Sequence, residues 1–195
     1  MAPPSNTPKK RLMIVNCAPA NFGKSNALKA LRLELLKRMK KALGHQPIRK
    51  KDFYCYFEKQ NKDEKDHAYL LHYSETVIAI FPAGDEPDRI KKNFNTACQW
   101  IETKKIPHKP MLCMRSKQKQ YCPDIFITAA HPERGIRLRI NNLARTNDYQ
   151  RNFKTHEFLP DNKGKRGASR KRYVAEVMFI IDEFIKQRKN KTLKK

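Results

Sequence analysis

Long apolar runs are missing from this sequence of 195 residues. None approaches the roughly 20 consecutive apolar residues that a membrane-spanning helix needs, so no membrane partner is expected. The histidines and cysteines also lack the spacing of metal ligands, and no serine stands in the GxSxG context of a hydrolase. The sequence therefore predicts neither a separate metal site nor a catalytic nucleophile.

Acidic residues are few compared with basic ones. The chain has 43 Lys plus Arg against 19 Asp plus Glu, which gives a formal net charge of +24. A field of this sign attracts polyanions such as nucleic acid and phosphorylated cofactors. Part of the charge belongs to a basic segment, residues 1–10, and a basic tail, residues 188–195, where solubility explains it equally well. Residues 11–187 are expected to form one domain.

The cysteines give no sign of a disulfide framework. There are five of them (Cys17, Cys55, Cys98, Cys113 and Cys122), an odd number without a CxxC pair, and no secretory leader precedes them. Reduced thiols in a cytoplasmic protein are the expectation.

Apolar runs of strand length alternate along the chain with segments of helical periodicity. The expected strands are residues 12–15, 48–57, 76–81, 111–114 and 153–159. The expected helices are residues 25–43, a short one ending near 71, 90–101, 136–150, and a last one capped by Ser169. Residues 120–135, which contain a further strand-like run, are interpreted as a small insertion, and residues 161–172 as a basic loop. Five strand–helix units predict an α/β, flavodoxin-like doubly wound fold: a five-stranded parallel sheet with helices on both faces.

The loop after the first strand is the first candidate binding site. In a doubly wound fold the ligand lies beyond the carboxyl ends of the strands, here at the switch point between the first and third strands. Backbone NH groups and the positive end of the following helix can surround a phosphate, while Gly23 removes side-chain bulk. The expected binding residues of this loop are Ala18, Pro19, Ala20, Asn21, Phe22, Gly23, Lys24, Ser25 and Asn26.

Flavodoxin-like, NAD(P)H-dependent FMN reductases provide the first resemblance. Residues 16–26 resemble their NGSPR…GN[ST] phosphate loop, and similar landmarks follow in order: a third strand ending in Pro82, Ile-Lys-Lys-Asn-Phe at 90–94, and Lys-Pro at 109–110. The resemblance implies an enzyme that binds FMN and passes a hydride to it from NAD(P)H, so that the flavin ring performs the chemistry. Further implied cofactor contacts are Pro82, Ala83, Gly84 and Asp85 in the third loop, and Tyr121, which could cover the flavin ring.

A second resemblance begins at the same loop. Residues 18–25 have the form [AG]xxxxGK[ST], which is similar to the Walker A loop of P-loop nucleoside triphosphatases. This implies a nucleoside triphosphatase or kinase that uses Lys24 and Ser25 on a magnesium nucleotide. Its Walker B acid should end a strand near the phosphates, and the best-placed carboxylate is Asp85, which is also positioned to cap the next helix.

A third alternative belongs to a non-enzyme class. The chain could be a flavodoxin-like scaffold without flavin, whose basic surface binds nucleic acid or another acidic partner. Within the expected insertion, His131 and Arg134 are interpreted as part of a solvated basic loop. The partners to be tested are thus flavin and nicotinamide nucleotides, nucleic acid bound without sequence preference, and a second copy of the chain in a homodimer.

Overall fold

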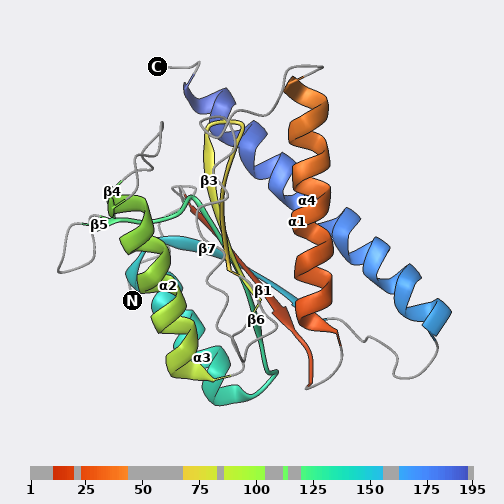
Figure 1. The fold of residues 1–195 in the computed structure, drawn as a ribbon. Coiled ribbons are helices and arrows are strands. Elements are labelled where there is room, and N and C mark those ends of the chain that lie inside the picture. The colour runs from red at the N-terminus through yellow and green to blue at the C-terminus, as the bar shows by residue number, and fades with distance from the viewer. Residues whose placement is uncertain are drawn as a thin grey trace.

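A five-stranded sheet runs through the centre of the computed structural model, which describes residues 11–19, 23–43, 68–82, 86–103, 112–113, 120–155 and 163–192 (Figure 1). Its strands are β1 (Arg11–Cys17), β2 (Tyr69–Tyr73), β3 (Thr76–Phe81), β6 (Ile125–Ala130) and β7 (Tyr149–Thr155). They lie in the order β2-β3-β6-β1-β7. β2 is antiparallel to β3, and the other neighbouring strands are parallel. The protein is therefore an α/β protein with a mostly parallel sheet.

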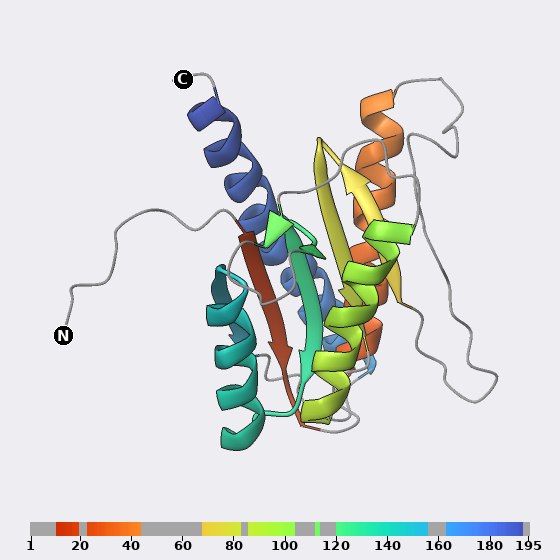
Figure 2. The same ribbon diagram turned by 90° about the vertical axis from the view of Figure 1, so that its left-hand side faces the viewer.

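Helices cover both faces of this sheet (Figures 1 and 2). α1 (Lys24–Leu43) and α4 (Lys163–Thr192) pack on one face, and α2 (Pro87–Thr103) and α3 (Arg134–Thr146) pack on the other. The connections β3–α2–β6 and β6–α3–β7 run on one face, whereas α1 leaves β1 on the opposite face. This layering is compatible with a doubly wound α/β fold.

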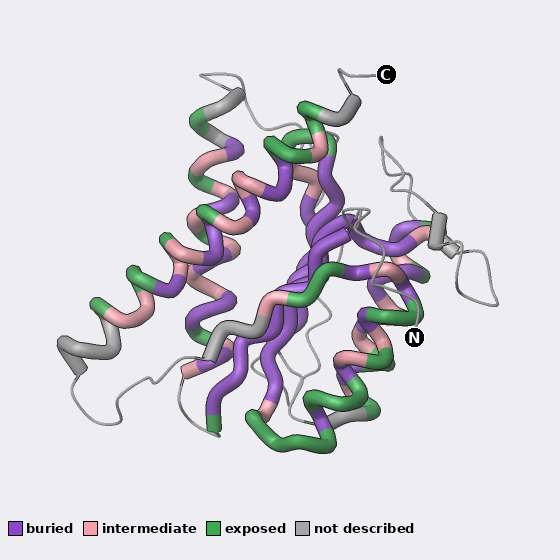
Figure 3. The backbone as a smooth tube through the Cα atoms, turned by 180° about the vertical axis from the view of Figure 1, so that it is seen from behind, coloured by how far each residue is buried: buried purple, intermediate pink, exposed green. Residues whose placement is uncertain are grey.

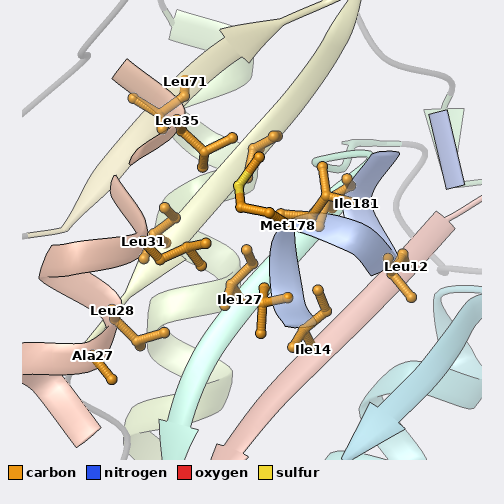
Figure 4. Packing of buried hydrophobic residues seen from close by; sticks show 14 of the residues in the cluster. Leu12, Ile14, Ala27, Leu28, Leu31, Leu35, Leu71, Ile127, Met178 and Ile181 are labelled. Carbon is orange, nitrogen blue, oxygen red and sulfur yellow. The ribbon is translucent and has the colours of Figure 1, made fainter. Parts of the chain in front are cut away.

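β1 is buried along its whole length because its alternate side chains enter the two layers. Leu12 and Ile14 pack toward α1 and α4, while Met13 and Val15 pack toward α2 and α3. Figure 4 shows part of the first layer: Leu28, Leu31 and Leu35 follow one another along α1 at helical spacing. They belong to the same buried cluster as Ile14, Ile127 and Met178 of α4. Each fully buried side chain of this kind contributes about 1.5–3 kcal/mol. Figure 3, in which the backbone is coloured by burial, shows buried residues through the sheet and along the sides of the helices that face it.

The second main-sheet strand differs from the expectation. Residues 48–57, expected as a strand, lie outside the described residues, and the short helix expected near residue 71 is wrong because Tyr69–Tyr73 form β2. Ser74 and Glu75 join β2 to β3 with φ angles of 49° and 60°. Two successive positive φ angles form the tight hairpin turn that matches the twist of antiparallel strands, so β2 pairs with β3.

The expected insertion near residues 120–135 is also wrong, because it contains a central strand of the main sheet. β6 is fully buried between β1 and β3. The run at 111–114, expected as the fourth strand, instead contributes β4 (Leu112–Cys113), which pairs with β5 (Gln120–Tyr121) in a separate two-stranded sheet. The runs at 111–114 and 125–130 are both short and apolar, but it is the longer run, 125–130, that forms a central strand with a neighbour on each side.

The carboxyl-terminal helix is longer than expected at both ends. α4 begins at Lys163, so most of the expected basic loop 161–172 is helical and Ser169 lies within the helix instead of capping it. It continues to Thr192, so the expected tail after Gln187 begins later. No helix in the described part of the chain is long and apolar enough to cross a membrane.

The cysteines differ from the expectation of reduced thiols alone. Cys122 is disulfide-bonded, whereas Cys17 and Cys98 are free and buried.

Candidate functional site

The switch point of the sheet lies between β1 and β6. These strands are parallel neighbours, with Cys17 opposite Ala130 at their carboxyl ends. The chain leaves β1 toward α1 on one face and leaves β6 toward α3 on the other. Ligands of open α/β sheets bind in the crevice that such diverging loops create. The expectation of a switch point between the first and third strands is wrong, because β6 separates β1 from β3.

The loop from β1 to α1 opens with a continuation of the strand and closes with a glycine. The Ala18 amide donates to the Ala130 carbonyl at 3.2 Å, which extends the β1–β6 ladder by one residue. Gly23 has φ +81° and accepts the first helical hydrogen bond, from the Ala27 amide at 2.9 Å. A left-handed residue directly before a helix favours glycine, so Gly23 sets the direction in which α1 starts.

Lys24, the first residue of α1, turns back over this loop. Its Nζ donates to the carbonyl oxygens of Ala18 at 2.8 Å and Pro19 at 3.2 Å, and its side chain is buried. Burying an ammonium group is costly unless acceptors surround it, and these carbonyls offset part of that cost. An anionic phosphate oxygen is a stronger acceptor than a neutral carbonyl, so the amino group is placed to exchange one for the other.

The first turn of α1 also supplies polar side chains at the same edge. Ser25 is half-buried and Asn26 is exposed, directly after Lys24. The NH groups of a first helical turn have no acceptor within the helix, and together with the positive end of the helix dipole they favour an anion here. The remaining expected loop residues, Ala20, Asn21 and Phe22, lie outside the described residues.

Arg137 of α3 is a second cation at this edge, and sequence reasoning missed it. Its side chain hydrogen-bonds to the Cys17 thiol at the end of β1. Burial raises the pKa of this thiol, whereas the positive charges of Arg137 and Lys24 act in the opposite direction. Both cations therefore act on one atom from opposite faces of the sheet. Arg137 could be predicted at this site only if β6 were assigned to the main sheet, because α3 then begins at the switch point.

Asn16 is an unusual buried group beside the loop. It is fully buried in β1, opposite Ala129 of β6, and within the described part of the chain neither its side-chain nitrogen nor its side-chain oxygen has a hydrogen-bond partner. Leaving buried polar atoms unpaired costs free energy, and such groups cluster where a protein needs them for something other than stability.

The other expected site residues fall in three places. Pro82 is buried at the carboxyl end of β3, while Ala83, Gly84 and Asp85 lie outside the described residues. Tyr121 lies in β5, which precedes the amino end of β6, so the structure does not bring it to the phosphate loop (Figure 1). His131 and Arg134, interpreted as a solvated loop of an insertion, instead follow β6 at the switch point, where His131 is half-buried and Arg134 exposed.

Comparison with known proteins finds no match to a family model, a curated protein or a solved structure. Among the residues that the structure describes, no three or more His, Cys, Asp or Glu side chains group as metal ligands. A magnesium ion that accompanies a nucleotide does not need such a group, since phosphates, waters and one or two protein oxygens complete its shell.

Proposed function

We propose that this chain is a P-loop nucleotide-binding protein that holds the phosphates of a magnesium nucleoside triphosphate in the loop 18–25. The observation that carries the proposal is the run of a buried strand, a left-handed Gly23, and Lys24 with its amino group folded over the loop carbonyls. This is the strand–loop–helix order of the motif, with its glycine and lysine in the positions where their chemistry is required.

In the proposed complex the loop residues share three tasks. Amides at the start of α1 donate to phosphate oxygens, and Lys24 moves its hydrogen bonds from the Ala18 and Pro19 carbonyls to the terminal phosphates. The Ser25 hydroxyl offers the protein oxygen for magnesium. The magnesium ion, when bound, neutralises charge on the phosphate chain.

The strand order supports this proposal over a flavodoxin-like FMN reductase. In the flavodoxin order 2-1-3-4-5 the first strand lies between the second and the third. Here the two neighbours of β1 are β6 and β7, so neither β2 nor β3 lies beside β1 as the flavodoxin order requires. In the observed order β2-β3-β6-β1-β7, β6 separates β1 from β3, an arrangement that the flavodoxin order does not contain. The FMN reductase becomes the second candidate.

The candidate for the magnesium-side acid is Asp85. It lies outside the described residues, but Pro82 and Glu86 on either side of it belong to the connection that leaves β3 at the carboxyl edge. Asp124, the buried acid next to β1, is at the opposite edge and binds Arg188. A triphosphatase or kinase reaction would therefore require Asp85 and not Asp124.

Isothermal titration with Mg-ATP, Mg-GTP, FMN and riboflavin tests the proposal. We expect a magnesium nucleoside triphosphate to bind and the Lys24→Met variant to lose at least about 100-fold in affinity, because the charged donor is removed. Lys37→Met changes an exposed lysine of the same helix and serves as the matched control. Tight FMN binding without nucleoside triphosphate binding would overturn the proposal in favour of the flavin enzyme, and parental affinity in Lys24→Met would remove the site.

A further inference from the structure

α3 is a basic helix without any acidic residue. Its sequence contains four arginines, and its buried residues (Ile136, Ile140 and Ala144) occupy one side. The side chains that face away from the sheet are exposed or half-exposed at helical spacing: Arg134, Leu138, Asn141, Asn142 and Arg145. Figure 3 shows the exposed outer turns of this helix. Nothing acidic on α3 opposes a polyanion that approaches this side.

Two of the arginines are already engaged. Arg139 forms an ion pair with Asp88 of α2, and Arg137 hydrogen-bonds to Cys17. Arg134 and Arg145, at the two ends of the helix, form no ion pair with any residue that the structure describes. Their charges are therefore available to an external anion.

The neighbouring strand extends this basic surface. β7 is the strand next to β1 at one end of the described sheet, and α3 leads directly into it. Arg151 of β7 is exposed and donates to the Asn141 side-chain oxygen at 2.6 Å, which joins the strand to the helix. A guanidinium has five N–H donors, so this bond leaves others for a ligand. We call Arg134, Arg145 and Arg151, with the two asparagines between them, the α3 surface.

We propose that the α3 surface binds the phosphate backbone of double-stranded DNA. Arg134 and Arg145 lie about 16 Å apart along the helix axis, enough to contact phosphates on both sides of a major groove about 12 Å wide. Arginine is the side chain best suited to phosphates, and the excess of 43 basic over 19 acidic residues adds attraction at longer range.

Other polyanions fit this surface less well. α3 contains no aromatic residue, so it lacks the stacking platform that single-stranded nucleic acid uses. An anionic membrane requires an apolar stripe that inserts, and Leu138 is the one large hydrophobic residue that α3 exposes. The deep, narrow major groove of double-stranded RNA excludes a helix.

Fluorescence anisotropy with a labelled DNA duplex in a salt series tests this surface. We expect the triple variant Arg134→Ala/Arg145→Ala/Arg151→Ala to lower the slope of log Kd against log salt by about 2 to 3, since each phosphate contact contributes about 0.9. The triple variant Lys37→Ala/Lys41→Ala/Lys189→Ala loses the same charge from exposed positions of α1 and α4 and should leave the slope within about 1 of the parent.

The outcomes separate the surface from general charge and from the nucleotide site. Equal slopes in the two triple variants, absence of DNA binding, or equal affinity for a single strand or an anionic vesicle would each overturn the proposal. A second duplex of unrelated sequence should bind with the same affinity within about threefold, because the contacts are to phosphates. Mg-ATP titration of Arg145→Ala/Arg151→Ala, which keeps the switch-point residue Arg134, should match the parent, so failure here does not depend on the nucleotide proposal.

Discussion

Buried polar groups have different partners at the two ends of the parallel strands, which we call the amino edge, where the strands begin, and the carboxyl edge, where they end. At the amino edge, Asp124 is buried and its two oxygens are both used: one accepts from the Val77 amide at 2.9 Å, and the other lies 2.8 Å from Arg188 of α4. The Tyr149 hydroxyl donates to the Pro123 carbonyl beside it. At the carboxyl edge, Lys24 donates to loop carbonyls, and both side-chain polar atoms of Asn16 lack a hydrogen-bond partner among the residues that the structure describes.

This difference distinguishes a structural edge from a binding edge. A charge held by an opposite charge and a backbone amide is fixed in the folded protein, and removing one partner leaves the other buried alone. A charge held by neutral carbonyls can take a stronger anionic acceptor without breaking an ion pair. We therefore expect changes at the amino edge to alter stability and changes at the carboxyl edge to alter ligand affinity.

Loss of Asp124 should have the largest effect. Asp124→Ala leaves Arg188 without its carboxylate and the Val77 amide without its acceptor, so the free energy of unfolding should fall by about 3–5 kcal/mol in urea titrations. Asp182→Ala removes the other Arg–Asp pair of α4, with Arg38 at 2.5 Å, where the side chains are 37% and 42% exposed. That control should cost less than about 1 kcal/mol. Equal losses in the two variants would refute the structural role of the amino edge.

A negative charge in the first turn of α1 should affect affinity next. Ser25→Glu places a carboxylate beside the proposed phosphates, so Mg-ATP affinity should fall by about 100-fold or more through like-charge repulsion. Stability should stay within about 0.5 kcal/mol, since an acid is tolerated at a helix N-terminus. Asn26→Glu adds the same charge at the exposed neighbour and should reduce affinity less, and Ser25→Thr keeps the hydroxyl and should bind as the parent does. Parental affinity in Ser25→Glu would place the phosphate elsewhere.

The two buried asparagines provide a smaller contrast. Asn16→Val removes an unpaired buried amide and should raise the free energy of unfolding by about 1 kcal/mol. Asn147, buried at the end of α3, donates its side-chain amide to the Leu143 carbonyl at 2.9 Å, so Asn147→Ala should lower stability by about 1 kcal/mol. Thermal unfolding measures both changes. A loss of stability in Asn16→Val would mean that its amide is satisfied in the folded protein.

The buried thiols should give the smallest effect, in the alkaline range. Burial, and secondarily the Glu102 carboxylate, raises the pKa of Cys98 to about 12, so the unfolded thiol ionises first and stability falls as pH rises above about 9. At Cys17, Arg137 and Lys24 oppose the rise in pKa that burial causes. Between pH 9 and pH 10, Cys98→Ala should therefore flatten the loss of stability more than Cys17→Ala. The reverse order in urea titrations at the two pH values would contradict the assigned electrostatics.

Elements that depend on local sequence signals could be predicted, whereas those that depend on long-range strand pairing could not. β1, α1 and β3 were predictable because continuous apolar runs and helical periodicity are local signals. The prediction gave residues 111–114 a place in the main sheet and residues 125–130 a place in an insertion, and the structure reverses the two. Both runs are short and apolar, and only pairing with β1 distinguishes them. β2 was missed because its turn has two residues with positive φ angles, neither of which is glycine or asparagine.

The candidate site was predictable in one half only. The motif at residues 18–25 is contiguous in sequence, and Gly23, Lys24 and Ser25 stand together at the start of α1. Arg137 and Asn16 depend on which strand lies beside β1, and that is a long-range property of the sheet. The same misplacement of β6 made His131 and Arg134 look like parts of an insertion.

The most direct test pairs one residue from each edge in two measurements, the free energy of unfolding in urea and the affinity for Mg-ATP. For Lys24→Met we predict an affinity loss of at least about 100-fold with stability within about 1 kcal/mol of the parent. For Asp124→Asn we predict a stability loss of about 2 kcal/mol or more with the affinity of the folded protein unchanged. The account is contradicted if Lys24→Met is destabilised as much as Asp124→Asn while the folded protein still binds Mg-ATP like the parent.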